Sequence, residues 1–456
     1  MKTITLNTLF LIVILSSCIN LSTSQNQTTE EVGENQTTEE VGENQTTEEV
    51  GENQTTEVGI NHETLKLVQL IIRHGDRVPE YPYPNDPFSD PSTWPEGWAQ
   101  LTDEGKQQEF QLGKYLRTRY GNYLNSTYVP NQVYVLSSDT DRTIMSALVA
   151  LAGMYPTNNE SNWDNTINWQ PVPIRTLFPE DDNLIRMKRE CPEFDRLFDD
   201  FIRNSPMMKK INEDNKDLFA TLSENSGVNI TTINEIDSFY ATLMVEEYKG
   251  KDIPEWGKTL KNDQHFQYLY NLSFAAKTST PELKKLRKGP LVKYLTDNVN
   301  ERVSNSSMKT KMFMLSGHDI TLIDTLNTFG VLDLQRPFYA SAFILELHQD
   351  PVTHNFFVEL FLRNDTTREP YKLTMPGCEF QCPLESFLNY TKPIIPNNWD
   401  AECQLTQPNV QEESSVFTYT IIAVGAIALV VFLLGLGCMF VQKRRKTNQR
   451  YEYQNF

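Results

Sequence analysis

Apolar stretches alternate along the chain with polar loops and amphipathic segments, in the order strand, loop, helix. Predicted strands lie at 65–72, 133–136, 312–315, 343–348 and 356–362. Predicted helices, with apolar positions on one face, lie at 101–120, 144–154 and 320–329. Thr102 is the predicted N-cap of the first helix. This order is typical of an α/β fold with a mixed, largely parallel central sheet flanked by helices.

The segment 157–294 breaks this order, because it is mostly helical and rich in loops. We interpret it as a helical cap domain inserted into the sheet domain. The sheet domain would then consist of 61–156 and 295–405.

Both ends of the chain have the pattern of targeting segments. Residues 1–24 contain a basic residue followed by an apolar run, which is typical of a secretory signal peptide. Residues 420–441 are 22 positions without a charge, against the roughly 20 needed to cross a bilayer, and Lys443-Arg444-Arg445-Lys446 follow. A buried core helix is the alternative, but the length and the basic flank disfavour it. The remaining parts of this predicted single-pass type I membrane protein are a juxtamembrane stalk at 406–419 and a cytoplasmic tail at 442–456.

Acidic repeats follow the signal peptide. The nine-residue unit Asn-Gln-Thr-Thr-Glu-Glu-Val-Gly-Glu recurs through 25–60 with almost no apolar residue, so this stretch is predicted to be disordered and a coiled coil is excluded. It contains no Lys or Arg and supplies part of the net charge of −19. This charge argues against nucleic acid as a partner, because a phosphate backbone is bound by clustered Lys and Arg.

The cysteines fit an oxidising compartment. Cys18 lies in the signal peptide and Cys438 in the membrane span, which leaves Cys191, Cys378, Cys382 and Cys403. Four cysteines allow three pairings, and a local Cys378–Cys382 bridge would leave Cys191–Cys403 to tie the middle of the chain to its end. A zinc site is the alternative, but no histidine lies near this cluster and secreted chains favour disulfides.

Motifs of the form Asn-x-Ser/Thr are dense in this chain. Four lie in the acidic repeat, and the others begin at Asn125, Asn159, Asn229, Asn271, Asn305, Asn364 and Asn389. In a secretory chain this density predicts glycosylation.

The loop after the first predicted strand carries candidate chemistry. Arg73, His74 and Arg77 surround Gly75, whose missing side chain allows the backbone to approach a ligand closely. Arginine binds phosphate oxygens bidentately. Neighbouring cations lower the pKa of a histidine, so His74 is expected to stay neutral and nucleophilic at mildly acidic pH. Arg-His-Gly is nevertheless a common tripeptide and does not establish catalysis by itself.

Two further strand-to-helix loops add charged residues. The second contains Asp139, Asp141 and Arg142, and N-capping is the simple explanation for its acids. The third contains His318 and Asp319 at a predicted helix N-terminus, which favours anions. Because the carboxyl ends of parallel strands meet at one edge of a sheet, we expect the histidines, the arginines and Asp319 to converge.

Longer motifs surround these residues. They are Leu67-Val68-Gln69-Leu70-Ile71-Ile72-Arg73-His74-Gly75-Asp76-Arg77-Val78-Pro79, Trp94-Pro95-Glu96-Gly97, Ser138-Asp139-Thr140-Asp141-Arg142, Trp169-Gln170-Pro171-Val172-Pro173, Ser316-Gly317-His318-Asp319 and Cys382-Pro383-Leu384-Glu385. Over about residues 62–405 the chain resembles the histidine acid phosphatases, in particular the lysosomal and prostatic acid phosphatases of animals.

The resemblance implies an acid phosphatase that hydrolyses phosphate monoesters through a covalent phosphohistidine intermediate. His74 would be the nucleophile, and Asp319 would be the general acid that protonates the leaving alcohol. The residues that would hold the phosphate oxygens are Arg73, Arg77, Arg142 and His318. No metal or organic cofactor is implied. Because Asp319 must be protonated to act, and a bound phosphate dianion should raise its pKa, an acidic working pH is expected.

Three alternative functions share features with this sequence. A phytase-like phosphatase for polyphosphorylated substrates would have a strongly basic pocket, but the sequence shows no extra cluster of Lys or Arg near the three loops. Lys188 and Arg189 are the nearest, and a solvated face explains them better. A phosphoglycerate mutase is disfavoured by the secretory route and by His318-Asp319. The acidic repeat favours a non-catalytic surface glycoprotein that uses the fold as a binding module, but every expected catalytic position is filled.

The last four residues, Tyr453-Gln454-Asn455-Phe456, have the form Tyr-x-x-apolar. This form resembles the tail signal through which adaptors sort membrane proteins to endosomes and lysosomes. We therefore expect the protein in lysosomes or endosomes or at the cell surface, with its catalytic domain luminal or extracellular. Dimerisation is common among the relatives, but the sequence shows no interface signal for a homodimer. The physiological substrate, and whether the ectodomain is shed from its anchor, are left open by the sequence.

Overall fold

The computed structural model describes residues 62–157, 163–164 and 166–405, together with four isolated positions at 429, 432, 433 and 436. The expected signal peptide, acidic repeat, juxtamembrane stalk and cytoplasmic tail lie outside these residues, as do Asn159, Tyr453 and most of the expected membrane span. Within the described part of the chain, no helix is both long enough and apolar enough to cross a bilayer.

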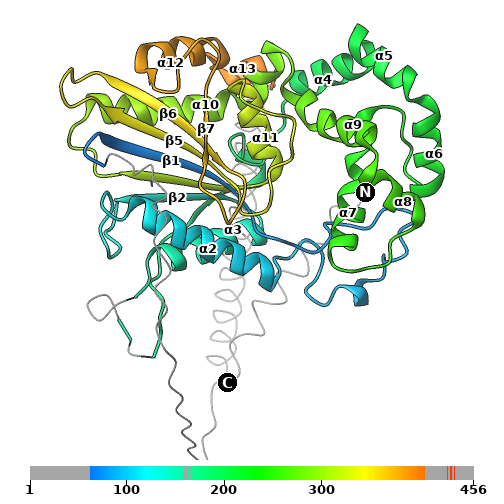
Figure 1. Ribbon diagram of the computed structural model, residues 1–456, viewed down its shortest axis with the longest axis horizontal. Coiled ribbons are helices and arrows are strands. Elements are labelled where there is room, and N and C mark those ends of the chain that lie inside the picture. Colours follow the sequence, from blue (N-terminus) through cyan, green and yellow to red (C-terminus); the bar gives the residue numbers. More distant parts are fainter. Residues whose placement is uncertain are drawn as a thin grey trace, which may run out of the picture. The chain divides into compact units, whose positions relative to one another are not determined.

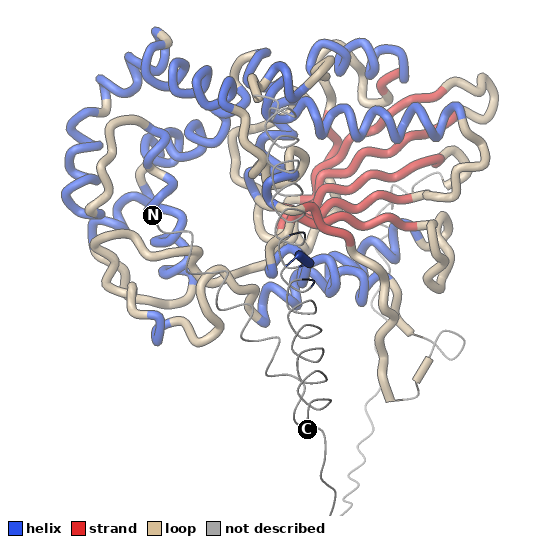
Figure 2. Tube along the Cα trace, turned by 180° about the vertical axis from the view of Figure 1, so that it is seen from behind, coloured by secondary structure: helices blue, strands red, loops and turns tan. Residues whose placement is uncertain are grey.

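The described residues form an eight-stranded sheet with the order β3-β2-β4-β1-β5-β6-β7, in which β8 pairs with β6 (Figure 2). Its strands are β1 (Leu65–Arg73), β2 (Val133–Ser138), β3 (Arg175–Leu177), β4 (Met312–Gly317), β5 (Ala342–Gln349), β6 (Phe356–Arg363), β7 (Tyr371–Leu373) and β8 (Cys382–Pro383). β1 to β4 run parallel, β5 is antiparallel to β1, and β6 is antiparallel to β5. Five of these strands therefore share one direction, which confirms the predicted mixed, largely parallel α/β fold.

The pairing of β1, β4 and β2 sets the position of the three candidate loops. β1 pairs in parallel with β4, so that Arg73 lies beside Gly317. β4 in turn pairs in parallel with β2, where Ser316 lies beside Ser137. The three strands therefore end at one edge of the sheet, and the loops that follow them begin side by side.

Helices cover both faces of the sheet (Figure 1). They are α2 (Asp103–Tyr120) and α3 (Asp141–Met154) on one face, and α10 (Pro281–Ser304), α11 (Asp319–Thr328) and α12 (Leu384–Thr391) on the other. Leu70 of β1 packs in the core under α2 and α3, whereas its neighbour Ile71 packs in the core under α10, α11 and α12. β1 is thus buried on both faces, as expected of a central strand between two helical layers.

Glycines allow α2 and α3 to pack at close range. A Cβ atom on Gly113 would lie 1.9 Å from the carbonyl oxygen of Ala150, and one on Gly153 would lie 2.3 Å from that of Phe110. Both distances are far below van der Waals contact, so any larger side chain must push the two helices apart.

A separate group of helices forms the cap region between β3 and α10 (Figure 1). They are α4 (Pro192–Asn204), α5 (Pro206–Asp214), α6 (Lys216–Ser226), α7 (Asp237–Tyr248), α8 (Glu255–Asn262) and α9 (Gln264–Ala275). Short helical turns in the chain are η1 (Pro91–Thr93), η2 (Pro179–Asp181), η3 (Ile233–Glu235), η4 (Ala276–Thr278), η5 (Lys392–Ile394) and α13 (Trp399–Glu402).

The cap has a hydrophobic core of its own. Phe239 and Phe266 are fully buried in it, and Tyr83 from the long loop after β1 and Ile323 of α11 join it. Through the side chains of Tyr83 and Ile323, the cap packs onto the sheet domain. The boundary expected at 294 falls inside α10, which packs on the sheet.

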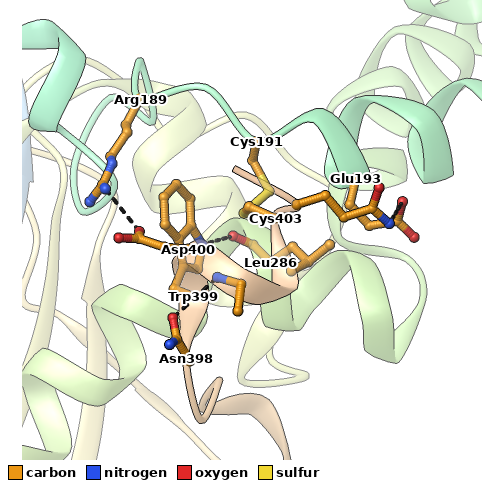
Figure 3. The surroundings of a disulfide bond; sticks show 10 residues. Arg189, Cys191, Glu193, Leu286, Asn398, Trp399, Asp400 and Cys403 are labelled. Carbon is orange, nitrogen blue, oxygen red and sulfur yellow. Dashed lines mark hydrogen bonds and ion pairs between the residues drawn. A yellow bond between two sulfur atoms is a disulfide. The ribbon is translucent and has the colours of Figure 1, made fainter. Parts of the chain in front are cut away.

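Both expected disulfides, Cys191–Cys403 and Cys378–Cys382, are formed. The first joins the residue before α4 to the residue after α13, across 212 positions of sequence (Figure 3). Trp399 supports this junction, since its indole N–H donates to the carbonyl oxygen of Leu286 in α10 (2.8 Å). The start of the cap is thereby fixed to the end of the described sheet domain.

Two acids are buried next to each other in the cap. Glu246 of α7 faces Asp86 from the loop after β1, and both residues are almost inaccessible to solvent. Burial, and then repulsion by Asp86, raise the pKa of Glu246 to about 9. In an unfolded chain a glutamate ionises at about pH 4.3.

Replacing Gly113 with Ala should destabilise the fold. The added methyl group meets the Ala150 carbonyl, and overpacking of this kind typically costs about 1–3 kcal/mol of unfolding free energy. Denaturant unfolding of the purified protein measures this loss of unfolding free energy. Gln111→Ala on the exposed face of α2 is the matched control. Equal stability of the two variants would contradict this account of the helix contact.

Replacing Glu246 with Gln should weaken the pH dependence of stability. From about pH 4 to pH 9 the folded chain holds a proton on Glu246 that the unfolded chain has lost. The stability of the parent therefore falls as pH rises through this window, and Glu246→Gln removes that contribution. Unfolding free energies measured across the window should diverge between parent and variant. Parallel curves would refute the assignment, and the exposed Glu224→Gln should follow the parent.

Candidate active site

The loop after β1 is held against the start of α2. The Oγ1 atom of Thr102 accepts from the backbone N–H of Gly105 (3.1 Å), which confirms Thr102 as the N-cap. A Cβ atom on Gly75 would lie 2.3 Å from the Gly105 carbonyl oxygen, so both glycines are needed for this close approach. The His74 backbone N–H donates to the carbonyl oxygen of Gly317 (3.0 Å), which links this loop to the end of β4.

His74 presents one ring nitrogen without a proton. Its Nδ1 lies 2.7 Å from the Gly75 carbonyl oxygen, and because a carbonyl can only accept, Nδ1 must carry the hydrogen. Nε2 then holds the free lone pair. Burial, and then the positive charges of Arg142 and Arg73, keep the pKa of His74 well below its ordinary value. The imidazole is therefore neutral, as expected from the sequence.

Arg142 and His318 are in contact beside His74. The rings of His74 and His318 lie 5.5 Å apart. An Arg142 guanidinium nitrogen lies 3.3 Å from Nδ1 of His318 and must donate to it, so His318 carries its proton on Nε2, which is 3.0 Å from Ser138 Oγ. Burial lowers the pKa of Arg142 to about 10, and Glu80 lies 3.4 Å from the guanidinium. Both side chains thus remain fixed next to the nucleophile candidate.

Asp319 begins α11 and is enclosed by donors. Its Oδ1 accepts from the backbone N–H of Ile320 (2.7 Å). Its Oδ2 accepts from Arg73 (3.1 Å) and from Nε of Arg336 (2.9 Å), and a second Arg336 nitrogen contacts the same oxygen. Burial alone would raise the pKa of Asp319, but Arg336 and Arg73 outweigh it and hold the pKa well below its usual range.

A cavity of about 210 Å³ opens above these groups. The predicted site residues in its wall are His74, Arg77, Arg142, His318 and Asp319. Arg73 lies behind the wall: its guanidinium donates to the Pro337 carbonyl (2.5 Å) and stacks on the Tyr339 ring at 4.2 Å. The structure thus brings all six predicted residues to one place, five of them facing the cavity.

The cavity is more basic than the sequence indicated. Five further cations line it: Arg186, Lys188, Lys277, Arg287 and Arg336. The expectation of no extra Lys or Arg cluster was therefore wrong. Of the two nearest candidates, Lys188 lines the cavity, although its side chain is exposed as expected of a solvated face. Only Arg189 lies elsewhere, paired with Asp400 (2.8 Å). These cations come from the cap region, from α10 and from the loop before β5, far in sequence from the three predicted loops, and no local motif marks them.

Some buried hydrogen-bond donors of the site lack an acceptor in the described part of the chain. Three side-chain N–H groups, the Nε atoms of Arg73, Arg77 and Arg142, have no hydrogen-bond partner among the described residues. Buried donors are nearly always paired, because an unpaired one costs about 1–3 kcal/mol. Unpaired guanidinium donors near a neutral histidine are what a site for a small oxyanion requires.

Outside this cavity, one cluster among the described residues consists of side chains that could ligate a metal ion. Glu346, His348 and Glu359 lie within reach of one ion. Arg119 and Tyr120 already bind Glu346 (2.9 and 2.6 Å), and His348 Nε2 lies 3.3 Å from the other oxygen of Glu346. This hydrogen-bonded network accounts for the cluster as a buried ion pair with a histidine.

Comparisons with known proteins agree with this geometry. The family model "Histidine phosphatase superfamily (branch 2)" matches residues 64–363. Prostatic acid phosphatase of Rattus norvegicus is 37% identical over 346 residues, covering 75% of this chain and 90% of that protein. Lysosomal acid phosphatase of Homo sapiens is 33% identical over 379 residues, covering 81% and 86%. Among solved structures, the Hafnia alvei phytase in its apo form has a TM-score of 0.57 at 16% identity, covering 75% of this chain and 98% of that one, which supports the fold alone.

Proposed function

The chain belongs to branch 2 of the histidine phosphatase superfamily and is a histidine acid phosphatase, and we propose that it hydrolyses phosphate monoesters through a phosphohistidine intermediate on His74. The observation that carries the proposal is the pairing of an unprotonated His74 Nε2 with buried guanidinium donors that lack acceptors. A phosphate group supplies the missing acceptors and an electrophilic phosphorus at once.

In the first step, His74 Nε2 attacks phosphorus while the bond from phosphorus to the alcohol oxygen breaks. Arg77 and Arg142 bind the equatorial oxygens, His318 holds Arg142 in place through its Nδ1, and Arg73 adds positive charge from behind. Phosphoryl transfer depends mainly on such positioning and charge neutralisation. Asp319 in its protonated form gives its proton to the departing oxygen, so that an alcohol leaves instead of an alkoxide.

In the second step, water attacks the phosphorus of phosphohistidine. Asp319, now a carboxylate, takes a proton from the water, the bond between nitrogen and phosphorus breaks, and inorganic phosphate leaves. His74 returns to its neutral form with the Nδ1 proton still bound to the Gly75 carbonyl. The cycle needs no group beyond those of this chain and water.

We extend the proposal to the cellular location. The lysosomal acid phosphatases among the relatives support residence in lysosomes or endosomes, reached through a signal peptide at 1–24, a span at 420–441 and an adaptor signal at Tyr453. Glycosylation is proposed at the described sequons Asn125, Asn229, Asn271, Asn305, Asn364 and Asn389. Each of these asparagines is exposed or partly exposed, which supports the assignment.

The basic cavity favours a second candidate within the same chemistry: a substrate that carries more than one phosphate. Lys277 of η4 makes no hydrogen bond or ion pair with the described residues, although it is partly buried in the cavity wall. Burial, and then repulsion by Arg287, lower its pKa. An anionic group on the leaving alcohol would relieve this repulsion.

Hydrolysis of an aryl phosphate without added metal should depend on His74 and Asp319. His74→Ala should abolish it, because no other group can accept the phosphoryl unit. Asp319→Asn should lower kcat by ~10²–10⁴-fold, the usual contribution of a general acid. Activity of the parent should fall from acidic to neutral pH. The exposed Asp297→Asn in α10 should keep the parental rate. A rate unaffected by His74→Ala, or a flat pH profile, would contradict the proposed mechanism.

Lys277→Met should separate the two substrate classes. We expect kcat/KM for inositol hexakisphosphate to fall about tenfold or more, the loss typical of a hydrogen bond to a charged group, while kcat/KM for the aryl phosphate changes little. Lys209→Met on exposed α5 removes the same charge outside the cavity and serves as control. Equal losses for both substrates would argue against a second anion site at Lys277.

A further inference from the structure

We propose that Arg336 is an exchangeable counter-ion of Asp319: it holds the carboxylate ionised while the site is empty and gives it up when a phosphate group binds beside His74. Substrate binding would then be coupled to the uptake of one proton by Asp319. The inference rests on the proposed function only in taking Asp319 as the general acid. Arg336 is a positioning residue in this scheme, because it acts through Asp319.

The empty site disfavours a proton on Oδ2 of Asp319. Oδ1 of Asp319 accepts from the Ile320 backbone, and Oδ2 is shared by Arg73 and Arg336. Both guanidinium groups are obligate donors, so a protonated Oδ2 would point a hydrogen at groups that cannot accept it. One of the two ion pairs must therefore open before Oδ2 can carry the proton that Asp319 gives to the leaving group.

Arg73 is not free to leave. Its guanidinium is buried, donates to the Pro337 carbonyl (2.5 Å) and stacks on Tyr339. Arg336 is the more accessible of the two, because it lies in the loop between α11 and β5, where its side chain keeps 22% of its surface exposed and lines the cavity. The Asp319–Arg336 pair is therefore the one that can exchange.

A second acid offers Arg336 an alternative partner. Arg336 donates to the Tyr270 hydroxyl, and this hydroxyl donates to Asp237 of α7 (3.3 Å). Asp237 also attracts Arg336 directly. Arg336 can thus turn toward Asp237 or toward a bound phosphate without losing charge compensation, which keeps the cost of opening the ion pair low.

The charged surroundings of Asp319 favour this exchange. A phosphate dianion entering the cavity both competes for Arg336 and repels the carboxylate, and both effects favour protonation of Oδ2. The titratable and charged groups that face Asp319 or interact with it are Arg73, His74, Glu80, Arg142, Asp237, Tyr270, Lys277, His318 and Arg336. Of these, Arg336 is the cation with the largest effect on Asp319.

One proton enters the cycle from solvent, and one proton is returned to solvent. Solvent supplies one proton to Oδ2 as substrate binds, and this proton passes to the alcohol oxygen when the bond to phosphorus breaks. The carboxylate that results takes a proton from the attacking water and returns it to solvent when phosphate leaves and Arg336 pairs again.

Calorimetry of inorganic phosphate binding tests the proposal on the purified full-length protein. Titrations at about pH 5 in buffers of different ionisation enthalpy give the number of protons taken up. Asp319→Asn serves as the reference, because it retains the ionisation of phosphate itself but lacks the carboxyl. We expect the parent to take up more protons than Asp319→Asn, and Arg336→Leu to lose most of this excess, since its Asp319 is already protonated in the empty site.

The pH dependence of kcat/KM gives a second readout that a purely structural role would not move. Removal of Arg336 raises the pKa of Asp319 in the free enzyme, so the alkaline limb of kcat/KM should shift to higher pH in Arg336→Leu. Arg336→Lys, which keeps the charge, should stay near the parent in both readouts. Arg368→Leu, an exposed arginine paired with Asp365 (3.2 Å), removes the same charge elsewhere and should leave both unchanged.

Unchanged proton uptake and an unmoved limb in a folded Arg336→Leu would overturn the proposal. The same shift in Arg336→Lys as in Arg336→Leu would also overturn it, because charge would then not be the cause. Proton uptake is measured without hydrolysis. A parent that binds phosphate with the expected uptake but hydrolyses no ester would therefore refute the proposed function and leave the role of Arg336 standing.

Discussion

Parallel pairing of β1 with β4, and of β4 with β2, is the constraint on which the rest of the site depends. It brings the ends of three strands to one edge and so collects Arg73, Arg142 and the two histidines in a space that water scarcely enters. Several buried cations next to each other repel one another and lose hydration. The structure tolerates this because His74 and His318 stay neutral and because Asp319 and Glu80 lie among the guanidinium groups.

The positive charge of the site is only partly compensated, and the excess favours the binding of an anion. Asp319 is shared between Arg73 and Arg336, and Glu80 is shared between Arg142 and Arg186. Two carboxylates thus serve four guanidinium groups. Lys277 forms no hydrogen bond or ion pair in the described part of the chain and lies over the Phe274 ring at 5.6 Å. A phosphate dianion supplies the missing negative charge in a water-poor site, where each ionic contact is stronger than at a surface.

The residues at the strand ends were predictable from the sequence, whereas the additional cations of the cavity wall were not. Arg73, His74, Arg142, His318 and Asp319 each follow a strand with a clear apolar pattern, so the α/β topology alone brings them together. Lys277 arrives from the cap, and Arg287 and Arg336 arrive from α10 and from the loop before β5. Their positions depend on how these elements pack, and periodicity carries no such information. β3, β7 and β8 are too short to show a period. Pro290 lies inside α10, where a proline usually breaks a helix, so no local pattern indicates that this helix continues across the expected boundary.

The cap must therefore be held in a fixed position, because the cations that it supplies act only within a few ångströms of the substrate. Two kinds of connection hold it. Cys191–Cys403 fixes the start of α4 to the end of the described sheet domain. At the other side, Lys249 after α7 forms an ion pair with the fully buried Asp76 of the catalytic loop, and Tyr248 donates to Glu104 in the first turn of α2. The same loop that carries His74 is thus in contact with the cap, so a shift of the cap would disturb the nucleophile as well as the basic wall opposite it. In the proposed mechanism, phosphoryl transfer takes place at the sheet edge and the cap wall recognises the leaving group, and the Asp76–Lys249 pair connects the two regions.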